Sequence, residues 1–239
     1  MVPAMNAAAE RNHRIYEDMW SHYRLFPHDG WAVWREIEPF YEKAERVLEI
    51  GPGMFPHLPI EGTTFLDLSS VALHALHERG GRCVRAASPL PLPDKSFDLV
   101  CLFEVLEHVE ADGELLGELA RVLRPGGVLF FSCPMNPGYF TYYDKVVGHE
   151  RRYRGDELRD KLAAHGFSIE AHCARHDFMD PWFGALFGFG TRYLSGLTAR
   201  IVRHYLPKVA ALEWPWREGD DLGEAEQRGG LTARARLRG

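Results

Sequence analysis

Two acids and two glycines stand at the ends of apolar runs, and their types and spacing suit the binding of a small molecule. The first run carries Glu49 and leads directly into a turn with Gly51 and Gly53, and the second run, residues 64–68, carries Asp67 near its end. Buried parallel strands that deliver their carboxyl ends to a pocket show this pattern. Gly51 suits a sharp turn, and Gly53 lets the backbone approach a ligand closely. Since an acid at the tip of the second strand can accept hydrogen bonds from both ribose hydroxyls, we expect a cofactor that contains a nucleoside.

Prolines in the same turn argue against a dinucleotide. A dinucleotide site uses a third glycine and a full helix whose N-terminus faces the pyrophosphate. Here the position of the third glycine is Pro56, and Phe55 and Pro59 crowd the turn, so only about one helical turn fits before the second apolar run. A cofactor without a pyrophosphate, such as S-adenosylmethionine, tolerates this turn. A dinucleotide oxidoreductase is therefore a less favoured hypothesis.

Five short segments share their order and spacing with a known family. They are VLEIGPG at 47–53, LDLS at 66–69, LPLPDKSFDLV at 90–100, FEVLEHV at 103–109 and LARVLRPGG at 119–127. Together they resemble the class I S-adenosylmethionine-dependent methyltransferases, and within these the type 11 small-molecule group, over about residues 45–170. The resemblance implies S-adenosylmethionine as cofactor and an antiparallel seventh strand beside the sixth.

The pattern of apolar runs and helical segments predicts an α/β fold. We expect a Rossmann-like, doubly wound sheet of seven strands at 46–50, 64–68, 83–86, 97–103, 128–133, 167–173 and 231–238, the last one antiparallel. We expect helices at 70–79, 112–123 and 156–165, and one or two more between 181 and 216. Residues 46–239 then form the cofactor-binding domain, in which 177–230 are a helical and loop insertion over the acceptor side, ending in an acidic loop at 218–230.

Residues 1–45 are expected to form an N-terminal helical cap, with a break at 27–30. Tyr16, Trp20 and Tyr23 recur at i, i+4 and i+7, so one helix face carries all three. This face either packs on the sheet domain or covers the cofactor, as N-terminal helices do in the family that the chain resembles. Aromatic rings over a sulfonium would contribute about 0.5–2 kcal/mol of cation–π attraction. We therefore include Tyr16 and Trp20 among the candidate substrate contacts.

Bulk composition excludes several classes of protein. The 239 residues carry a net charge of −6, which gives no general attraction to nucleic acid or to an anionic membrane. No apolar run approaches roughly 18 residues and the N-terminus lacks the order of a signal peptide, so we expect a cytoplasmic protein without stable membrane insertion. The cysteines lack paired metal spacing and are expected to be reduced core residues: Cys83, Cys101, Cys133 and Cys173.

The resemblance assigns the cofactor contacts residue by residue. Gly51 and Gly53 would surround the methionine part, Asp67 the ribose, and Glu49 the amino group through a water. The alternatives are that Glu49 caps a neighbouring turn and that Asp67 caps the helix near Ser70. The acid that meets the adenine amino group in many relatives falls at Ala86, so that contact would come from Ser88 or from backbone. The full predicted set is Glu49, Gly51, Gly53, Asp67, Leu68, Ser88 and Glu104.

Acceptor residues are sought after the fifth strand, in the loop from 134 to 153. Methyl transfer mainly requires the acceptor to be held in line with the carbon–sulfur bond, and it needs a general base only if the acceptor starts protonated. His149 is the predicted base, Arg152 would pair an acidic acceptor, and Tyr153 and Tyr139 would wall an aromatic or apolar one. The alternative is that the arginines pair with Glu150 and Asp156 and fix the loop. His108 is expected to be structural.

The leading hypothesis is an enzyme that moves a methyl group from S-adenosylmethionine to an oxygen or nitrogen of a small-molecule metabolite or biosynthetic intermediate. The alternative is a non-catalytic S-adenosylmethionine-binding protein that regulates or scaffolds a partner. The Asn/Asp-Pro-Pro-aromatic run of DNA methyltransferases and the acids of metal-dependent catechol-type enzymes are absent from the expected positions. We therefore expect a small-molecule acceptor with an aromatic or apolar part, no nucleic acid, no metal and a possible homodimer.

Overall fold

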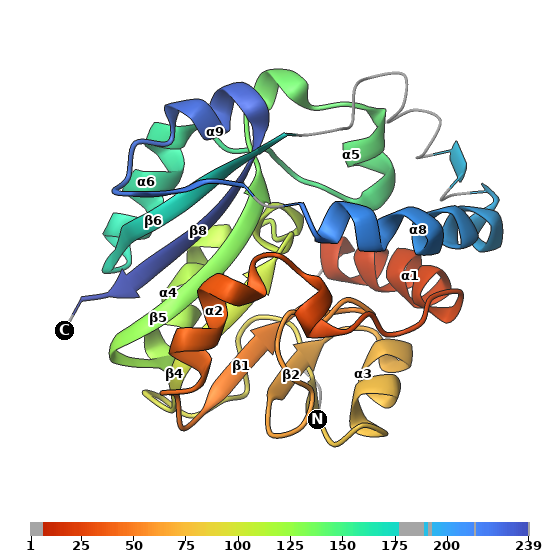
Figure 1. Ribbon diagram of the computed structural model, residues 1–239, viewed down its shortest axis with the longest axis horizontal. Helices are drawn as coiled ribbons and strands as arrows, with labels where there is room; N and C mark the ends of the chain where they lie inside the picture. The colour runs from red at the N-terminus through yellow and green to blue at the C-terminus, as the bar shows by residue number, and fades with distance from the viewer. Residues whose placement is uncertain (1–6, 177–188, 191–192, 213, 239) are drawn as a thin grey trace.

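The computed structural model describes residues 7–176, 189–190, 193–212 and 214–238. Its centre is a mixed sheet of eight strands in the order β3-β2-β1-β4-β5-β8-β6-β7 (Figure 1). The strands are β1 Val47–Ile50, β2 Thr64–Asp67, β3 Arg82–Arg85, β4 Phe97–Phe103, β5 Leu123–Pro134, β6 Phe167–His176, β7 Trp216–Glu218 and β8 Gly229–Leu237. The helices are α1 Ala7–Ser21, α2 Trp34–Tyr41, α3 Ser70–His77, α4 Asp112–Val122, α5 Tyr142–Val147, α6 Gly155–Ala164, α8 Ser195–Ala210 and α9 Gly223–Arg228.

The five neighbouring strands β3, β2, β1, β4 and β5 are parallel. Strand β8 is antiparallel to both of its neighbours, β5 and β6. This arrangement confirms the predicted Rossmann-like class and the antiparallel last strand beside the sixth. The count of seven strands was too low. The additional strand, β7, pairs antiparallel with β6 at the edge of the sheet, and the ring of its Trp216 lies 6.2 Å from that of Phe130.

Both faces of the sheet are covered, which explains why its central strands are apolar without alternation. Every residue of β1 is buried, and β4 is buried at five of its seven positions. On one face, leucines of α4 and α6, among them Leu116 and Leu158, pack into the largest core cluster. On the other face, Ile37 and Phe40 of α2 pack against Leu99 and Phe130.

The loop predicted between 134 and 153 contains a short 3-10 helix, Pro137–Tyr139, and the helix α5. A reciprocal capping box between Thr141 and Asp144 begins α5, and Gly148 ends it in the left-handed region at φ 83°. The predicted loop at 218–230 was also wrong in part, because Gly223–Arg228 form α9. Both misses are helices of six residues, too short for a periodic apolar pattern to announce them.

Two helices that are far apart in the sequence, α1 and α8, lie beside each other near the carboxyl ends of the strands. Figure 1 shows α1 and α8 side by side, and residues of the two helices are in contact. Within the described residues, no helix combines the length and the apolar character needed to cross a membrane. Residues 177–188, 191–192 and 213 of the predicted insertion lie outside the described residues.

Candidate functional site

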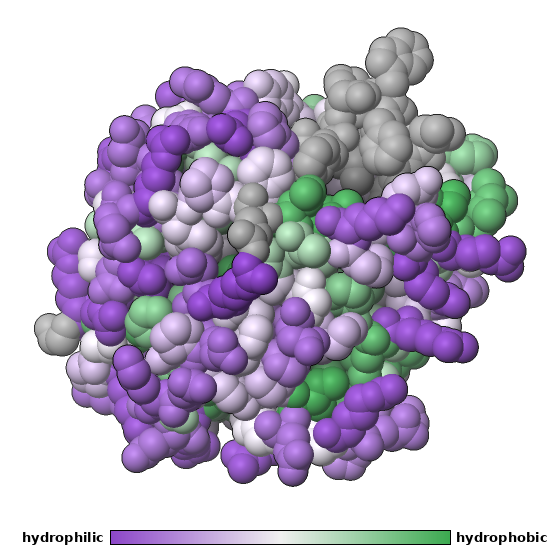
Figure 2. All heavy atoms as spheres, viewed as in Figure 1, coloured by the Kyte–Doolittle hydropathy of each residue, from purple (hydrophilic) through white to green (hydrophobic). Residues whose placement is uncertain are grey.

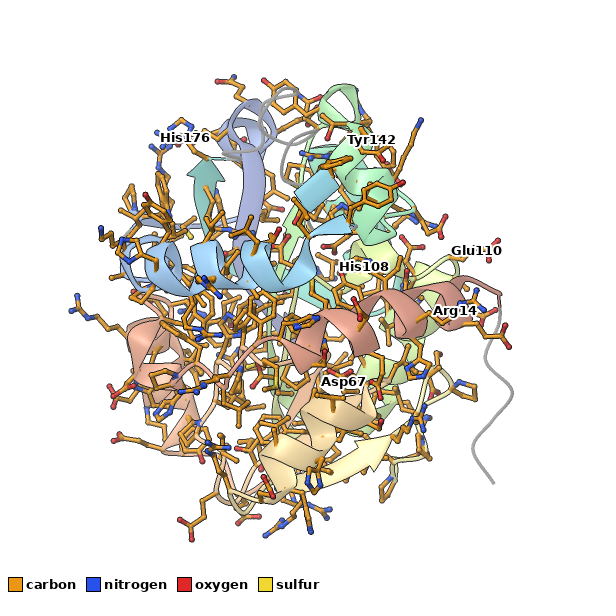
Figure 3. The ribbon with its side chains drawn as sticks, turned by 90° about the vertical axis from the view of Figure 1, so that its right-hand side faces the viewer. Arg14, Asp67, His108, Glu110, Tyr142 and His176 are labelled. Atoms are coloured by element: carbon orange, nitrogen blue, oxygen red, sulfur yellow. The ribbon has the colours of Figure 1, made fainter. Side chains whose placement is uncertain are left out.

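A cavity of about 870 Å³ opens at the carboxyl ends of β1, β2, β4 and β5. Side chains of α1 and α8 line it opposite the strand ends, among them Tyr16 and Trp20 of α1 and Val202 and Leu206 of α8. Figure 3 looks onto these two helices and labels Asp67 and His108 on opposite sides of α1 in that view. Ligand crevices in open α/β sheets lie at this edge, and the volume suits a drug-sized ligand.

Asp67 lies at the tip of β2, on the cavity wall. Its Oδ2 accepts a hydrogen bond from the backbone N–H of Gly53 at 2.9 Å, and its Oδ1 accepts one from that of Ser69 at 2.8 Å. Burial raises the pKa of Asp67, and the two backbone hydrogen bonds oppose that rise. The helix α3 is capped by Ser69, whose hydroxyl accepts from the N–H of Ala72 at 3.1 Å, so capping α3 is not the role of Asp67. Each carboxylate oxygen keeps a lone pair for a further donor.

Both glycines of the turn after β1 have left-handed backbone conformations, with φ 66° at Gly51 and 52° at Gly53. A Cβ at Gly51 would lie 2.7 Å from the Val105 side chain. A Cβ at Gly53 would lie 2.3 Å from the indole ring of Trp20. Gly51 lines the cavity, whereas the close approach at Gly53 is made by Trp20 of α1.

Glu49 is buried, and its carboxylate caps a neighbouring turn. It accepts hydrogen bonds from the N–H groups of His57 and Leu58 at distances of 2.9 and 3.1 Å, and His57 Nδ1 lies 3.2 Å from Oε1. This is the alternative that the sequence left open for Glu49. Because Glu49 also lines the cavity, its predicted contact with the cofactor amino group stays a prediction.

The predicted adenine end is a continuous stretch of the cavity wall. Leu68 follows Asp67, and Ala86, Ala87 and Ser88 follow β3 on the same wall. No acid occurs among residues 86–88, which agrees with Ala86 at the position where many relatives have an acid. The predicted contact from Ser88 therefore has the right location and stays a prediction.

At the other end of the cavity, Asp144 of α5 holds two side chains that follow it in the sequence, those of His149 and Arg152. Its carboxylate accepts from Arg152 Nε at 2.9 Å and Nη2 at 3.0 Å, and His149 Nδ1 lies 2.7 Å from Oδ1. Burial alone would raise the pKa of Asp144, but the hydrogen bonds from His149 and Arg152 hold it well below its usual range. Arg152 is buried and lines the cavity, and its guanidinium pairs with Asp144.

Two further acids lie between Asp144 and the sheet. Glu104, at φ 54°, accepts from Ser132 Oγ at 2.6 Å and from Arg175 Nη2. Burial opposes ionisation of Glu104, but the charge of Arg175 and the hydrogen bonds from Ser132 and Arg175 together lower its pKa. Glu107 is fully buried, and burial followed by the charge of Glu104 raises its pKa well above the usual range.

His108 is the last residue of a 3-10 helix, Leu106–His108, and its structural role stays a prediction. Its Nε2 lies 3.2 Å from the Tyr16 hydroxyl, and its Nδ1 lies 3.2 Å from the carbonyl oxygen of Gly148. The Tyr16 ring stacks on that of Trp20 at 5.6 Å between centroids, and burial raises the pKa of Tyr16 well above its usual value. Tyr16 and Trp20 therefore lie against the cavity, as predicted.

Two predicted acceptor residues lie away from the cavity wall. Tyr153 is 1% exposed, and its hydroxyl donates toward the Leu106 carbonyl at 3.1 Å and Asp112 at 2.9 Å inside the core. Tyr139 is 45% exposed and its hydroxyl donates to the Gln227 carbonyl. The structure does not support a wall role for either. Glu107, Asp144, Ser132 and Arg175 were not predicted, although Glu107 lies in the 103–109 segment and Asp144 in the loop from 134 to 153.

Comparison with known proteins agrees with this geometry. Residues 48–131 match the family described as Methyltransferase domain. Residues 48–131 of this chain are thus similar to a methyltransferase domain. A probable S-adenosylmethionine-dependent methyltransferase of Mycolicibacterium smegmatis is 40% identical over 133 residues, which are 54% of this chain and 47% of that protein. The chain thus spans about half the length of these curated relatives.

Two other comparisons bear on the substrate and on the fold. The mitochondrial ubiquinone biosynthesis O-methyltransferase of Dictyostelium discoideum is 34% identical over 61 residues, covering 26% of this chain and 19% of that protein. A crystal structure of a possible histamine N-methyltransferase from Thermotoga maritima has a TM-score of 0.60 at 19% identity and covers 98% of this chain and 100% of its own. At this identity, the structural likeness supports the shared fold alone. The cofactor of the domain family is S-adenosylmethionine.

Proposed function

We propose that this chain binds S-adenosylmethionine in the cavity and transfers its methyl group to an oxygen or nitrogen of a small molecule. The observation that carries the proposal is the pair of neighbouring strand ends. After β1, the backbone turns at Gly51, and at the tip of β2 both oxygens of Asp67 keep lone pairs for the ribose hydroxyls. The proline-broken turn leaves no helix N-terminus for a pyrophosphate.

Part of the cavity wall is made of apolar side chains, which favour an acceptor with an aromatic or apolar part. Val202, Leu206 and Val209 of α8 line it, together with Trp214 and Trp216. The Dictyostelium relative is named for ubiquinone biosynthesis, and this name supports the same class of acceptor. We take α1 and α8 as the cover of the acceptor end, because both contribute side chains to the wall.

Methyl transfer from a sulfonium depends mainly on position, because the methyl group is already activated. Orientation of the acceptor behind the carbon–sulfur bond can remove about 7–11 kcal/mol of the barrier. If the acceptor starts protonated, His149 is the proposed base. It would take the proton through Nε2, because Nδ1 is held by Asp144 at 2.7 Å.

Calorimetry tests the cofactor part of the proposal. We expect S-adenosylhomocysteine to bind in the micromolar range and NAD not to bind. Asp67→Ala should weaken that binding more than about tenfold, which corresponds to about 1.4 kcal/mol. Asp156→Ala is the matched control, since Asp156 is an exposed acid on α6, away from the cavity wall. Unchanged affinity in Asp67→Ala would refute the ribose assignment.

Turnover separates an enzyme from a non-catalytic binding protein. Release of S-adenosylhomocysteine should rise when apolar phenols, catechols and amines are supplied as acceptors, and mass spectrometry of the products would locate the new methyl group. Tight binding with no turnover over the whole panel would favour a regulatory or scaffold role. His149→Ala should cut turnover while leaving affinity for S-adenosylhomocysteine unchanged.

A further inference from the structure

Glu107 is an acid without a hydrogen-bond partner in the interior of the protein. Its side chain is 0% exposed, and neither carboxylate oxygen has a hydrogen-bond partner among the described residues. An unpaired carboxylate at such a position costs several kcal/mol unless a proton or a cation neutralises it. Its sequence neighbour His108 and the cavity-lining His149 each offer a ligand atom close to it.

The two imidazoles are oriented as metal-binding histidines are. Such a histidine usually donates one ring N–H to a carboxylate or a backbone carbonyl, which leaves the other nitrogen as the ligand. His149 Nδ1 lies 2.7 Å from Asp144 Oδ1, so its Nε2 faces Glu107 Oε1 at 3.8 Å. His108 Nδ1 lies 3.2 Å from the Gly148 carbonyl oxygen. In His149, a proton on Nδ1 leaves the Nε2 lone pair for a cation. In His108, Nε2 lies 3.2 Å from the Tyr16 hydroxyl, so a cation bound there would take the place of that contact.

We propose that Glu107, His108 and His149 bind a divalent transition-metal cation at the acceptor end of the cavity. One ligand atom from each lies within 4.8 Å of the other two. Ligands on a tetrahedral cation such as Zn²⁺ lie about 3.3 Å apart, given metal–ligand bonds of about 2.0–2.2 Å, so small side-chain rotations close the site. The Tyr16 hydroxyl, which contacts His108 Nε2, keeps the Val147 carbonyl as an acceptor at 3.3 Å.

The surrounding charges favour a cation. Three buried or half-buried carboxylates gather here, and two guanidinium groups pair with two of them, Arg152 with Asp144 and Arg175 with Glu104. Glu107 is the third. The backbone holds the site together as well, because the N–H of Glu150 donates to the Glu107 carbonyl at 2.7 Å. Two imidazoles and one carboxylate suit Mn²⁺, Fe²⁺, Co²⁺ or Zn²⁺ better than Ca²⁺ or Mg²⁺.

A cation bound at this site would restrict the class of methyl acceptor. This step of the inference rests on the proposed function. His108 and His149 line the cavity, so the remaining coordination positions face it. These positions suit an acceptor with a hydroxyl, such as a phenol or catechol, whose pKa falls on binding the cation. The hydroxyl proton passes to water, the oxygen forms a bond to the methyl carbon, and the carbon–sulfur electron pair returns to sulfur. His149 would then be a ligand and not the base, because one lone pair cannot serve both roles.

Co²⁺ titration of the full chain, freed of chelators and of any affinity tag, tests the site through visible absorption. We expect one Co²⁺ per chain and d–d bands that report bound nitrogen and oxygen ligands. Glu107→Gln should weaken Co²⁺ binding at least tenfold while keeping the shape of the side chain and removing a buried charge. The matched controls are His74→Ala and Glu78→Gln, an exposed histidine–glutamate pair at 3.4 Å, which should leave the titration unchanged.

Absence of stoichiometric Co²⁺ binding, or equal affinity in Glu107→Gln, would overturn the proposal. Thermal melting checks that each variant folds, and His149→Gln supplies a second variant that should lose the same bands. S-adenosylhomocysteine calorimetry on the same samples keeps the two proposals apart. Cofactor binding without Co²⁺ binding defeats the metal site alone, whereas Co²⁺ binding without cofactor binding defeats the methyltransferase proposal alone.

Discussion

The two ends of the cavity are built in different ways. At the cofactor end, Asp67 is held by backbone N–H groups of Gly53 and Ser69, which are 14 and 2 residues away in the sequence. At the acceptor end, side chains hold one another: Asp144 pairs with His149 and Arg152, 5 and 8 positions away, and Glu104 pairs with Arg175, 71 positions away. The cofactor end is therefore held by backbone groups of a short motif, whereas the acceptor end is held by side chains, and its Glu104–Arg175 pair forms only in the folded chain. The predictions below test this difference.

The largest effect is expected at the acceptor end, from Asp144→Asn. Loss of this carboxylate leaves the buried Arg152 without its counterion, so we expect about 3–5 kcal/mol less stability in urea unfolding at neutral pH. Asp156→Asn, in an exposed pair with Arg154, is the control and should have no measurable effect. A small loss in Asp144→Asn would show that the network does not hold this end together.

The same residue predicts a pH dependence. Because the pKa of Asp144 is lower in the folded chain than in the unfolded chain, its contribution to stability is full above the unfolded pKa of about 3.9. The contribution disappears as the pH falls further, through the folded pKa. Unfolding free energies between pH 6 and pH 3 should therefore fall more steeply in the wild type than in Asp144→Asn, and parallel curves would contradict this assignment.

At the cofactor end, we expect the backbone at Gly53 to be the group most sensitive to substitution, and Gly53→Ala tests this. The substitution places a side chain at φ 52° and against the Trp20 ring, so we expect a loss of about 1–3 kcal/mol and weaker binding of S-adenosylhomocysteine. The double variant Gly53→Ala with Trp20→Ala removes the clash but keeps the backbone strain. It should be less destabilised than the sum of the two single variants, and strict additivity would mean that the contact is unimportant.

Tyr153→Phe tests whether Tyr153 belongs to the core or to the acceptor wall of the cavity. We expect a loss of about 1 kcal/mol in unfolding, because the hydroxyl bonds to Asp112 and to the Leu106 carbonyl are removed, while affinity and turnover stay unchanged. A fall in turnover with intact stability would restore the wall role that the sequence suggested.

The smallest effect is expected from Tyr139→Phe. Its hydroxyl donates to a carbonyl at 3.2 Å on an exposed surface, so stability should change by less than about 0.5 kcal/mol. Equal turnover in the variant and the wild type would agree with its position outside the cavity wall, and a clear fall would contradict it.

The features that depend on a local motif could be predicted from the sequence. The strand that leads into Gly51, the acid at the second strand tip and the parallel strands of the sheet follow from apolar runs, turn residues and crossover rules. These features depend on neighbours within a few positions. For Glu49, the sequence left open both a turn cap and a contact with the cofactor, because a carboxylate can serve as either.

The acceptor end could not be read in the same way. Tyr153 and Arg152 are adjacent, yet Tyr153 points into the core and Arg152 lines the cavity. The residues 152 and 153 lie on a short extended stretch that bridges Met135, and alternate side chains of such a stretch point in opposite directions. Which of the two faces the cavity depends on register, and register is set by the whole fold. The pairing of Glu104 with Arg175 likewise joins residues 71 positions apart.

The position of β8 has a consequence for the newly made chain on the ribosome. β6 ends at His176, but the strand that joins it to β5 begins only at Gly229. Until β8 emerges, one edge of β5 and one edge of β6 lack their partner and offer unpaired backbone groups to other chains. The sheet thus closes only after residues 177–228 have been made, and conditions that slow translation between these two strands should raise the demand for chaperones.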